Sequence, residues 1–255
     1  MKRRALILIA ILILSVAFIS CKGGNQKSGE AESADGGNAK ILKTINHGEG
    51  VSTEYEYNDK KHLVRLVTTD LDIYGERNNG EKVEDITTIT YSGNDIVSIS
   101  DPYLGILGFE RKGNTIAIIG GEALSVILTL DGEGNVIKKV TSVESDEGSE
   151  VLYEYSAGNL VKVIEVYSFA TIVNDYTYDD RKSLFNCNTP KWFMQYYHSP
   201  SSSRNEFGAS KNNIIGVRNE YGETMYSYEY DDDDYPVAVE YNGYHWGFNE
   251  FKYFE

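Results

Sequence analysis

Short runs in which apolar and polar residues alternate recur along this chain and predict β-strands. The stretch YEYSAGNLVKVIEV at residues 153–166 shows the unit: aromatics at alternate positions, a break at Ser-Ala-Gly-Asn, and a return run rich in Val and Ile. Side chains of a strand point alternately to opposite faces, so Tyr153 and Tyr155 share one face and Glu154 takes the other. Gly-Asn supplies the positive φ that tight turns need. The unit is therefore predicted to be a β-hairpin.

Related units recur at short intervals, and their turns come in two lengths. They begin near Tyr55, Thr90, Phe109, Leu128, Tyr176 and Tyr228. The opening and return runs are separated by five positions in Tyr91–Ile96 and Tyr155–Leu160, and by six in Tyr57–Leu63, Leu130–Val136 and Tyr178–Leu184. A change of one residue turns every side chain of the return strand to the other face unless the turn absorbs it. We therefore expect bulged turns in the longer set.

The repetition predicts the fold class. An isolated hairpin is only marginally stable in water, so successive hairpins are expected to pair edge to edge. The composition fits β structure, with 20 Tyr and 24 Gly against only 4 Pro. Open twisted sheets of more than about ten strands tend to curl or close. Residues 41–255 are predicted to form one all-β domain, a long antiparallel meander curved into a half-barrel or a flattened barrel.

The stretch NTPKWFMQYYHSPSSS at residues 188–203 interrupts the repeats and predicts one short helix around 190–197. Thr189 followed by Pro190 is a helix-start signal, a cap before proline in the first turn. Trp192, Phe193, Tyr196 and Tyr197 would then share one face of the helix. In one interpretation this face plugs the curved sheet; in the other, Trp192, Tyr196 and Tyr197, with Trp246, form an aromatic platform for sugars. Buried aromatics usually serve packing, which favours the plug.

The amino terminus has the pattern of a bacterial lipoprotein signal. Basic residues precede an uncharged run too short for a membrane span of about 20 residues, and Phe18-Ile19-Ser20-Cys21 then resembles a lipobox. The sequence predicts a signal peptide over residues 1–20, acylation of Cys21, and a flexible Gly- and Ser-rich tether over residues 21–40. The lipid bilayer is thus an expected partner. Lys22-Gly23-Gly24-Asn25 after the cysteine leaves cell-surface and periplasmic exposure both open.

The hairpins also resemble a known family. Tyr-x-Tyr-Asp, a short turn and a hydrophobic return look like the YD-type repeats of bacterial surface proteins. The mature chain resembles a family of Bacteroides-type lipoproteins of unknown function with a porin-like fold. The clearest match runs from Ser210–Ile214 through Tyr226–Asp231 to Tyr235–Val237. This resemblance implies a curved antiparallel β fold and no assigned activity.

The net charge and the sequence motifs limit the ligands and cofactors that we expect for this chain. The formal net charge is -15, and removal of the three basic residues Lys2, Arg3 and Arg4 leaves 21 basic against 39 acidic residues, or -18. Such a chain repels nucleic acid. The four histidines, at positions 47, 62, 198 and 245, lack zinc-ligand spacing, and no cofactor motif occurs. Asp231–Asp234 matches the turn of the other copies, so solvated turn residues are expected there, with a calcium site as the alternative.

We therefore expect a non-catalytic binding or scaffold module of the cell envelope, an outer-membrane lipoprotein on its periplasmic face or at the cell surface. Its partner would be a glycan or another envelope protein. The alternative is a hydrolase acting on polysaccharide or peptide, for which the sequence shows no convergent set of polar groups. A membrane-spanning barrel ranks last, because the strands are short and the chain is acidic.

Overall fold

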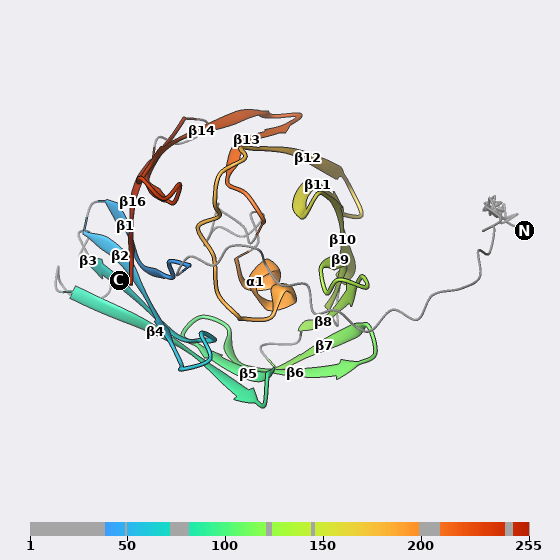
Figure 1. Ribbon diagram of the computed structural model, residues 1–255. Coiled ribbons are helices and arrows are strands. Elements are labelled where there is room, and N and C mark those ends of the chain that lie inside the picture. Colours follow the sequence, from blue (N-terminus) through green and yellow to red (C-terminus); the bar gives the residue numbers. More distant parts are fainter. Residues whose placement is uncertain are drawn as a thin grey trace, which may run out of the picture. The chain divides into compact units, whose positions relative to one another are not determined.

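The computed structural model describes residues 39–48, 50–71, 82–120, 124–143, 146–198, 210–242 and 247–254. Sixteen strands form a closed antiparallel barrel in which each strand pairs with its neighbours in sequence and β1 pairs with β16 (Figure 1). The strands are β1 Leu42–Gly48, β2 Val51–Tyr57, β3 Leu63–Leu71, β4 Lys82–Ser92, β5 Asp95–Asp101, β6 Gly105–Lys112, β7 Thr115–Gly120, β8 Leu124–Leu130, β9 Val136–Val143, β10 Asp146–Ser156, β11 Asn159–Val166, β12 Thr171–Tyr178, β13 Ile214–Asn219, β14 Gly222–Tyr230, β15 Pro236–Asn242 and β16 Gly247–Tyr253.

This architecture confirms the predicted all-β meander with one short helix, and of the two predicted curved forms the barrel is the one observed. Closure follows from strand number, since a twisted sheet of this size buries its edges by pairing the first strand with the last. In the described part of the chain no helix is both long and apolar enough to cross a membrane.

The alternation of apolar and polar residues along the sequence corresponds to side chains that face alternately the inside and the outside of the barrel. In β2, Thr53 and Tyr55 are buried while Glu54 and Glu56 are exposed. The buried apolar side chains of all the strands converge in one core cluster together with those of the helix. The face that Tyr153 and Tyr155 share is therefore the inner one.

Bulges occur in the short hairpins as well as in the longer set in which we expected them, whereas the β6–β7 hairpin at Phe109 has a regular register. The register shifts at the last core-facing residue of the opening strand, which is Tyr91 or Tyr155 in the short hairpins and Tyr57 or Leu130 in the long ones. The shift lets this residue and the apolar residue paired with it on the return strand both face the core. Short and long turns both require this arrangement, because the residues on the two sides of the turn are apolar in both sets.

A second repeated device links the return strands of four hairpins to the strands that follow them. A core-facing tyrosine on the following strand donates its hydroxyl hydrogen to the carbonyl of the first or second residue of the return strand. The pairs are Tyr91 to Leu63 (2.9 Å), Tyr155 to Val136 (3.0 Å), Tyr178 to Leu160 (2.6 Å) and Tyr253 to Pro236 (2.7 Å). Burial raises the pKa of Tyr91 and Tyr178 to about 12, so both remain neutral donors. The tyrosine of the repeat is therefore a structural residue.

The connection from β12 to β13 replaces the sixth predicted hairpin. Tyr178 pairs with Ile214, and Leu184, which the spacing placed on a return strand, is instead buried in the intervening segment. That segment holds α1, Lys191–Tyr197. Thr189 does not cap this helix as predicted: Pro190 occupies the cap position, and the Thr189 hydroxyl accepts the backbone N–H of Leu63 at 2.8 Å.

Candidate functional site

The described part of the segment between β12 and β13 packs into the interior of the barrel. Sixteen strands enclose an interior wider than wall side chains alone can fill. In Figure 1, α1 lies inside the ring of strands. Trp192, Phe193 and Met194 are buried in the core, and Phe193 stacks edge-on against Phe109 of β6 with ring centroids 6.0 Å apart. The helix therefore lies in the interior of the barrel, as the plug interpretation expects.

The plug is fastened to one edge of the barrel, called here the plugged edge, where β2–β3, β8–β9 and β10–β11 turn. Its side chains and backbone hydrogen-bond to each of these turns. The Gln195 amide accepts the N–H of Val136 at 2.8 Å, Ser210 accepts the N–H of Leu160 at 3.4 Å, and the Asn188 amide donates to the Lys60 carbonyl at 2.7 Å. The plug thus satisfies backbone groups that the bulges leave without a strand partner.

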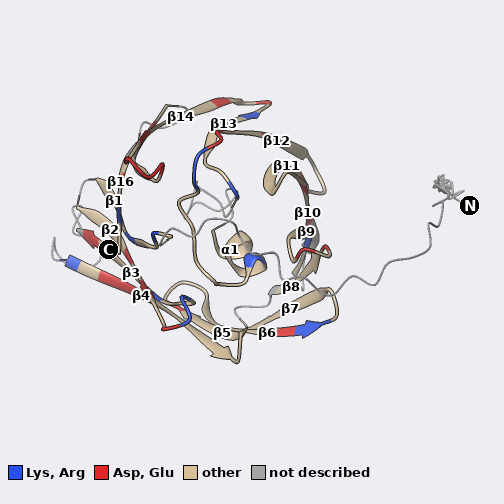
Figure 2. Cartoon of the chain, viewed as in Figure 1, with Lys and Arg blue, Asp and Glu red and all other residues tan. Residues whose placement is uncertain are grey.

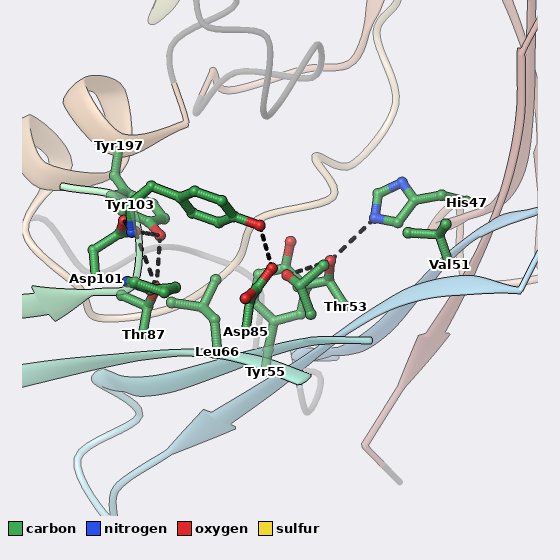
Figure 3. A pocket seen from close by; sticks show the side chains of 12 residues that line it. His47, Val51, Thr53, Tyr55, Leu66, Asp85, Thr87, Asp101, Tyr103 and Tyr197 are labelled. Carbon is green, nitrogen blue, oxygen red and sulfur yellow. Dashed lines mark hydrogen bonds between the residues drawn. The ribbon is translucent and has the colours of Figure 1, made fainter. Parts of the chain in front are cut away.

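A cavity of about 390 Å³ lies toward the other edge, the pocket edge, where β1–β2 and β5–β6 turn. Its walls come from β1 to β5, and Tyr197 from the last turn of α1 reaches it from the plug (Figure 3). The lining residues are His47, Val51, Thr53, Tyr55, Leu66, Thr68, Asp85, Thr87, Asp101, Pro102, Tyr103 and Tyr197. This size suits a small molecule or one end of a larger one.

Asp101 joins the plug to the pocket. Its carboxylate is buried and accepts the Thr87 hydroxyl at 3.1 Å and the Tyr197 hydroxyl at 3.0 Å. The same carboxylate also accepts the backbone N–H groups of Tyr103 and Leu104, both at 2.9 Å, in the β5–β6 turn. Four donors hold it in place, which makes Asp101 an anchor for the pocket wall.

His47 stands across the cavity and is neutral. Burial lowers its pKa, and the hydrogen bond with Asn249 opposes that effect. Nδ1 lies 2.8 Å from the Asn249 amide oxygen, which accepts, so Nδ1 carries the proton. Nε2 then accepts the Thr53 hydroxyl at 3.1 Å, and the Thr53 oxygen lies 3.3 Å from that of Thr68. The wall therefore presents an ordered chain of hydroxyl and imidazole groups.

Tyr103 forms the lip of the cavity. Its side chain is 60% exposed, and its hydroxyl donates to the Asp85 carboxylate of β4 (Figure 3). An exposed aromatic ring beside acceptor oxygens is the combination that stacks on an apolar face while binding hydroxyl groups at its edge.

The structure separates the residues that the sequence proposed as a platform. Tyr197 lines the pocket, Trp192 is only 5% exposed within the core, and Tyr196 is half-buried against Phe109. Trp246 and Cys21 lie outside the described residues, as do the predicted signal peptide and nearly all of the tether. The pocket residues His47, Asp85 and Asp101 were not singled out by the sequence.

The acidic turn Asp231–Asp234 is occupied by contacts within the chain. The Asp231 carboxylate accepts the backbone N–H groups of Asp233 and Tyr235, both at 3.0 Å, and Lys40 at 2.7 Å. Asp234 pairs with Arg181 of the plug segment. Within the described residues, no group of three or more His, Cys, Asp or Glu side chains is placed to hold a metal ion.

Comparison with known proteins shows which solved structures the fold is similar to. A porin-like protein from Bacteroides uniformis is 14% identical, with the alignment covering 83% of this chain and 94% of that chain at a TM-score of 0.55. This chain has a porin-like fold. A porin-like protein from Bacteroides vulgatus is also 14% identical over 83% of this chain and 98% of its own, at a TM-score of 0.35. No protein-family model and no curated protein matches the sequence.

Proposed function

We propose that this chain is a lipid-anchored, non-catalytic binding protein of the cell envelope whose pocket holds a glycan. The observation that carries the proposal is the asymmetry of the barrel: an aromatic plug fills one edge, and the cavity toward the other edge rests on that plug. The lipobox at Cys21 and the tether support attachment to the outer membrane, through acyl chains that each contribute about 0.8 kcal/mol per buried CH₂.

The lining suits a polyhydroxylated ligand. Sugars present hydroxyl groups around a ring whose C–H faces are apolar, and the pocket offers hydroxyls, carboxylates and the exposed Tyr103 ring. The neutral His47 adds no charge. Asp101 already accepts four hydrogen bonds, and this favours a structural role in the pocket wall rather than a role as the proton donor of a hydrolase.

The test is an array of envelope glycans probed with the chain from residue 21 onward, carrying Cys21→Ser to prevent acylation. We expect binding that Tyr103→Ala weakens at least tenfold, about 1.4 kcal/mol. Tyr221→Ala is the matched control, since Tyr221 is 63% exposed in a turn at the same edge but does not line the pocket.

Three outcomes oppose the proposal. An equal loss of glycan binding in the two variants would show that the pocket is not the binding site. If no glycan on the array binds, the ligand is not a glycan. Release of new reducing ends from a bound glycan favours the hydrolase instead.

A further inference from the structure

A second group of polar side chains faces the interior of the barrel near the pocket edge, on strands other than those that line the cavity. Lys139 of β9 and Glu165 of β11 both lie opposite Val151 of β10, a core residue that is only 4% exposed. Asn174 of β12 lies opposite the fully buried Val163. Directly opposed residues of neighbouring strands share one face of the sheet. The side chains of Lys139, Glu165 and Asn174 therefore point inward.

Hydrogen bonds join most of these side chains into one network. The Glu165 carboxylate accepts the Tyr167 hydroxyl at 2.6 Å and an amide N–H of Asn174 at 3.3 Å. The Asn174 amide oxygen in turn accepts an N–H of Asn219, at the end of β13, at 2.9 Å. Polar groups that satisfy one another in this way form a rigid arrangement. We call Lys139, Glu165, Tyr167, Asn174 and Asn219 the polar wall.

Lys139 brings a cation to the polar wall. Its side chain is half-buried, and within the residues that the structure describes its ammonium group forms no hydrogen bond or ion pair. Burial lowers the pKa of Lys139, and the charge of Glu165 opposes that effect. An ammonium group has three N–H donors, and withdrawing them from water without a partner is unfavourable. Lys139 is therefore placed to donate to the oxygen atoms of a ligand.

An aromatic pair continues the polar wall to the rim of the barrel, in the β11–β12 turn at the pocket edge. Phe169 is 86% exposed, and its ring stacks on that of Tyr167 with centroids 5.7 Å apart and planes 18° from parallel. Because the Tyr167 hydroxyl is bound to Glu165, the stacked pair is tied to the wall. The outer face of the Phe169 ring remains in water, and covering it with an apolar surface is favourable.

The polar wall repeats the chemistry of the pocket lip. Tyr103 presents an exposed ring beside Asp85, and Phe169 presents one that is linked to Glu165 through Tyr167. In Figure 1, β11 and β12 lie across the ring of strands from β4 and β5. A ring of sixteen strands about 4.8 Å apart is about 24 Å across, so the two positions are too far apart for a single sugar.

We propose that the polar wall and Phe169 form a second sugar-binding subsite, which together with the pocket holds an oligosaccharide across the mouth of the barrel at the pocket edge. Resting on the glycan-binding function proposed above, this subsite sets the length of the ligand. Sugars carry hydroxyl groups around apolar C–H faces. Glu165 accepts hydrogen bonds from such hydroxyls, Lys139 donates to them, and the Phe169 ring stacks on a C–H face.

The charges of the chain favour a neutral oligosaccharide. Acidic and basic residues are interspersed around the ring of strands in Figure 2, but the chain as a whole has a formal net charge of -15. A polyanionic glycan is therefore repelled at long range. Within the polar wall the charges of Lys139 and Glu165 cancel, which favours neither an anionic nor a cationic sugar.

The experiment is isothermal titration calorimetry of the chain from residue 21 onward with Cys21→Ser, using the disaccharide and the hexasaccharide of the cello-, malto- and N-acetylchito-oligosaccharide series. In the series that binds, we expect the hexasaccharide to bind about tenfold more tightly than the disaccharide, or better. Phe169→Ala should remove this gain and leave the affinity for the disaccharide unchanged. Lys139→Met has no N–H donor and should reduce the gain about threefold.

Phe254→Ala is the matched control, because Phe254 is 43% exposed and follows the end of β16 at the plugged edge. It should leave both affinities unchanged. Circular dichroism checks that each variant folds.

Several outcomes overturn the second subsite while a glycan in the pocket stands. These are equal affinities of the natural chain for the two lengths, a gain that survives Phe169→Ala, and an equal loss of both affinities in that variant. Tighter binding of a galacturonic acid hexamer than of any neutral hexasaccharide overturns the neutral ligand class. Absence of binding in all three series overturns the subsite together with the proposed function.

Discussion

The two edges of this barrel use the same strands for different purposes. Along the inner face of β4, Ile89 and Tyr91 near the plugged edge belong to the core, while Asp85 and Thr87 near the pocket edge line the cavity. The alternation of the strand is unbroken, and only the chemistry of the inward side chain changes. One end of the barrel is thereby packed with apolar side chains and the other lines a polar cavity, with Tyr197 in contact with both.

The largest expected difference between the edges comes from the plug. Phe193 is fully buried and stacks on Tyr197 with ring centroids 5.5 Å apart, so Phe193→Ala leaves a cavity between helix and wall. We expect a loss of about 3–5 kcal/mol in the free energy of unfolding, measured by urea titration. Tyr221→Ala at the pocket edge should change it by about 0.5 kcal/mol or less. Similar losses in the two variants would contradict the division between edges.

A smaller effect is expected where the plug meets the strands. Thr189→Val removes the acceptor for the Leu63 N–H, which is buried and has its partner in the plug. A buried donor left unsatisfied costs about 1–3 kcal/mol. The matched variant is Thr90→Val on the exposed face of β4, which should be neutral within about 0.5 kcal/mol. Equal urea midpoints for the two would show that the plug does not hold the turns.

The plugged edge could largely be predicted from the sequence, and the pocket edge could not. Alternation with period two and the Trp192–Tyr197 pattern depend on local geometry, which a single sequence carries. The bulges escaped prediction in the short hairpins because they are set by which residues must face the core, not by turn length. Leu184 was misplaced because an apolar residue after a turn signal fits a plug as well as a strand.

The pocket depends on closure of the barrel. His47 and Asn249 are 202 positions apart and meet only because β1 pairs with β16. One signal was present: Asp85 and Thr87 occupy inward positions in a strand whose other inward residues are apolar. Polar residues on a core face indicate a lined cavity once the facing strand is known, and a single sequence does not supply that strand.

The smallest expected effect is a pH dependence of the free energy of unfolding that comes from His47 at the pocket edge. Burial lowers the pKa of His47 in the folded chain, so below about pH 6.5, the ordinary value, the unfolded chain binds a proton that the folded chain resists. Stability should therefore be unaffected above that pH and fall as the pH drops through the window down to the lowered value. His47→Gln keeps a polar side chain but cannot titrate. Urea unfolding at pH 7.5 and 5.5 should show a larger loss in the natural chain than in the variant. Equal losses would mean that His47 is as readily protonated in the folded pocket as in water, and its Nε2 would then donate to Thr53 instead of accepting from it.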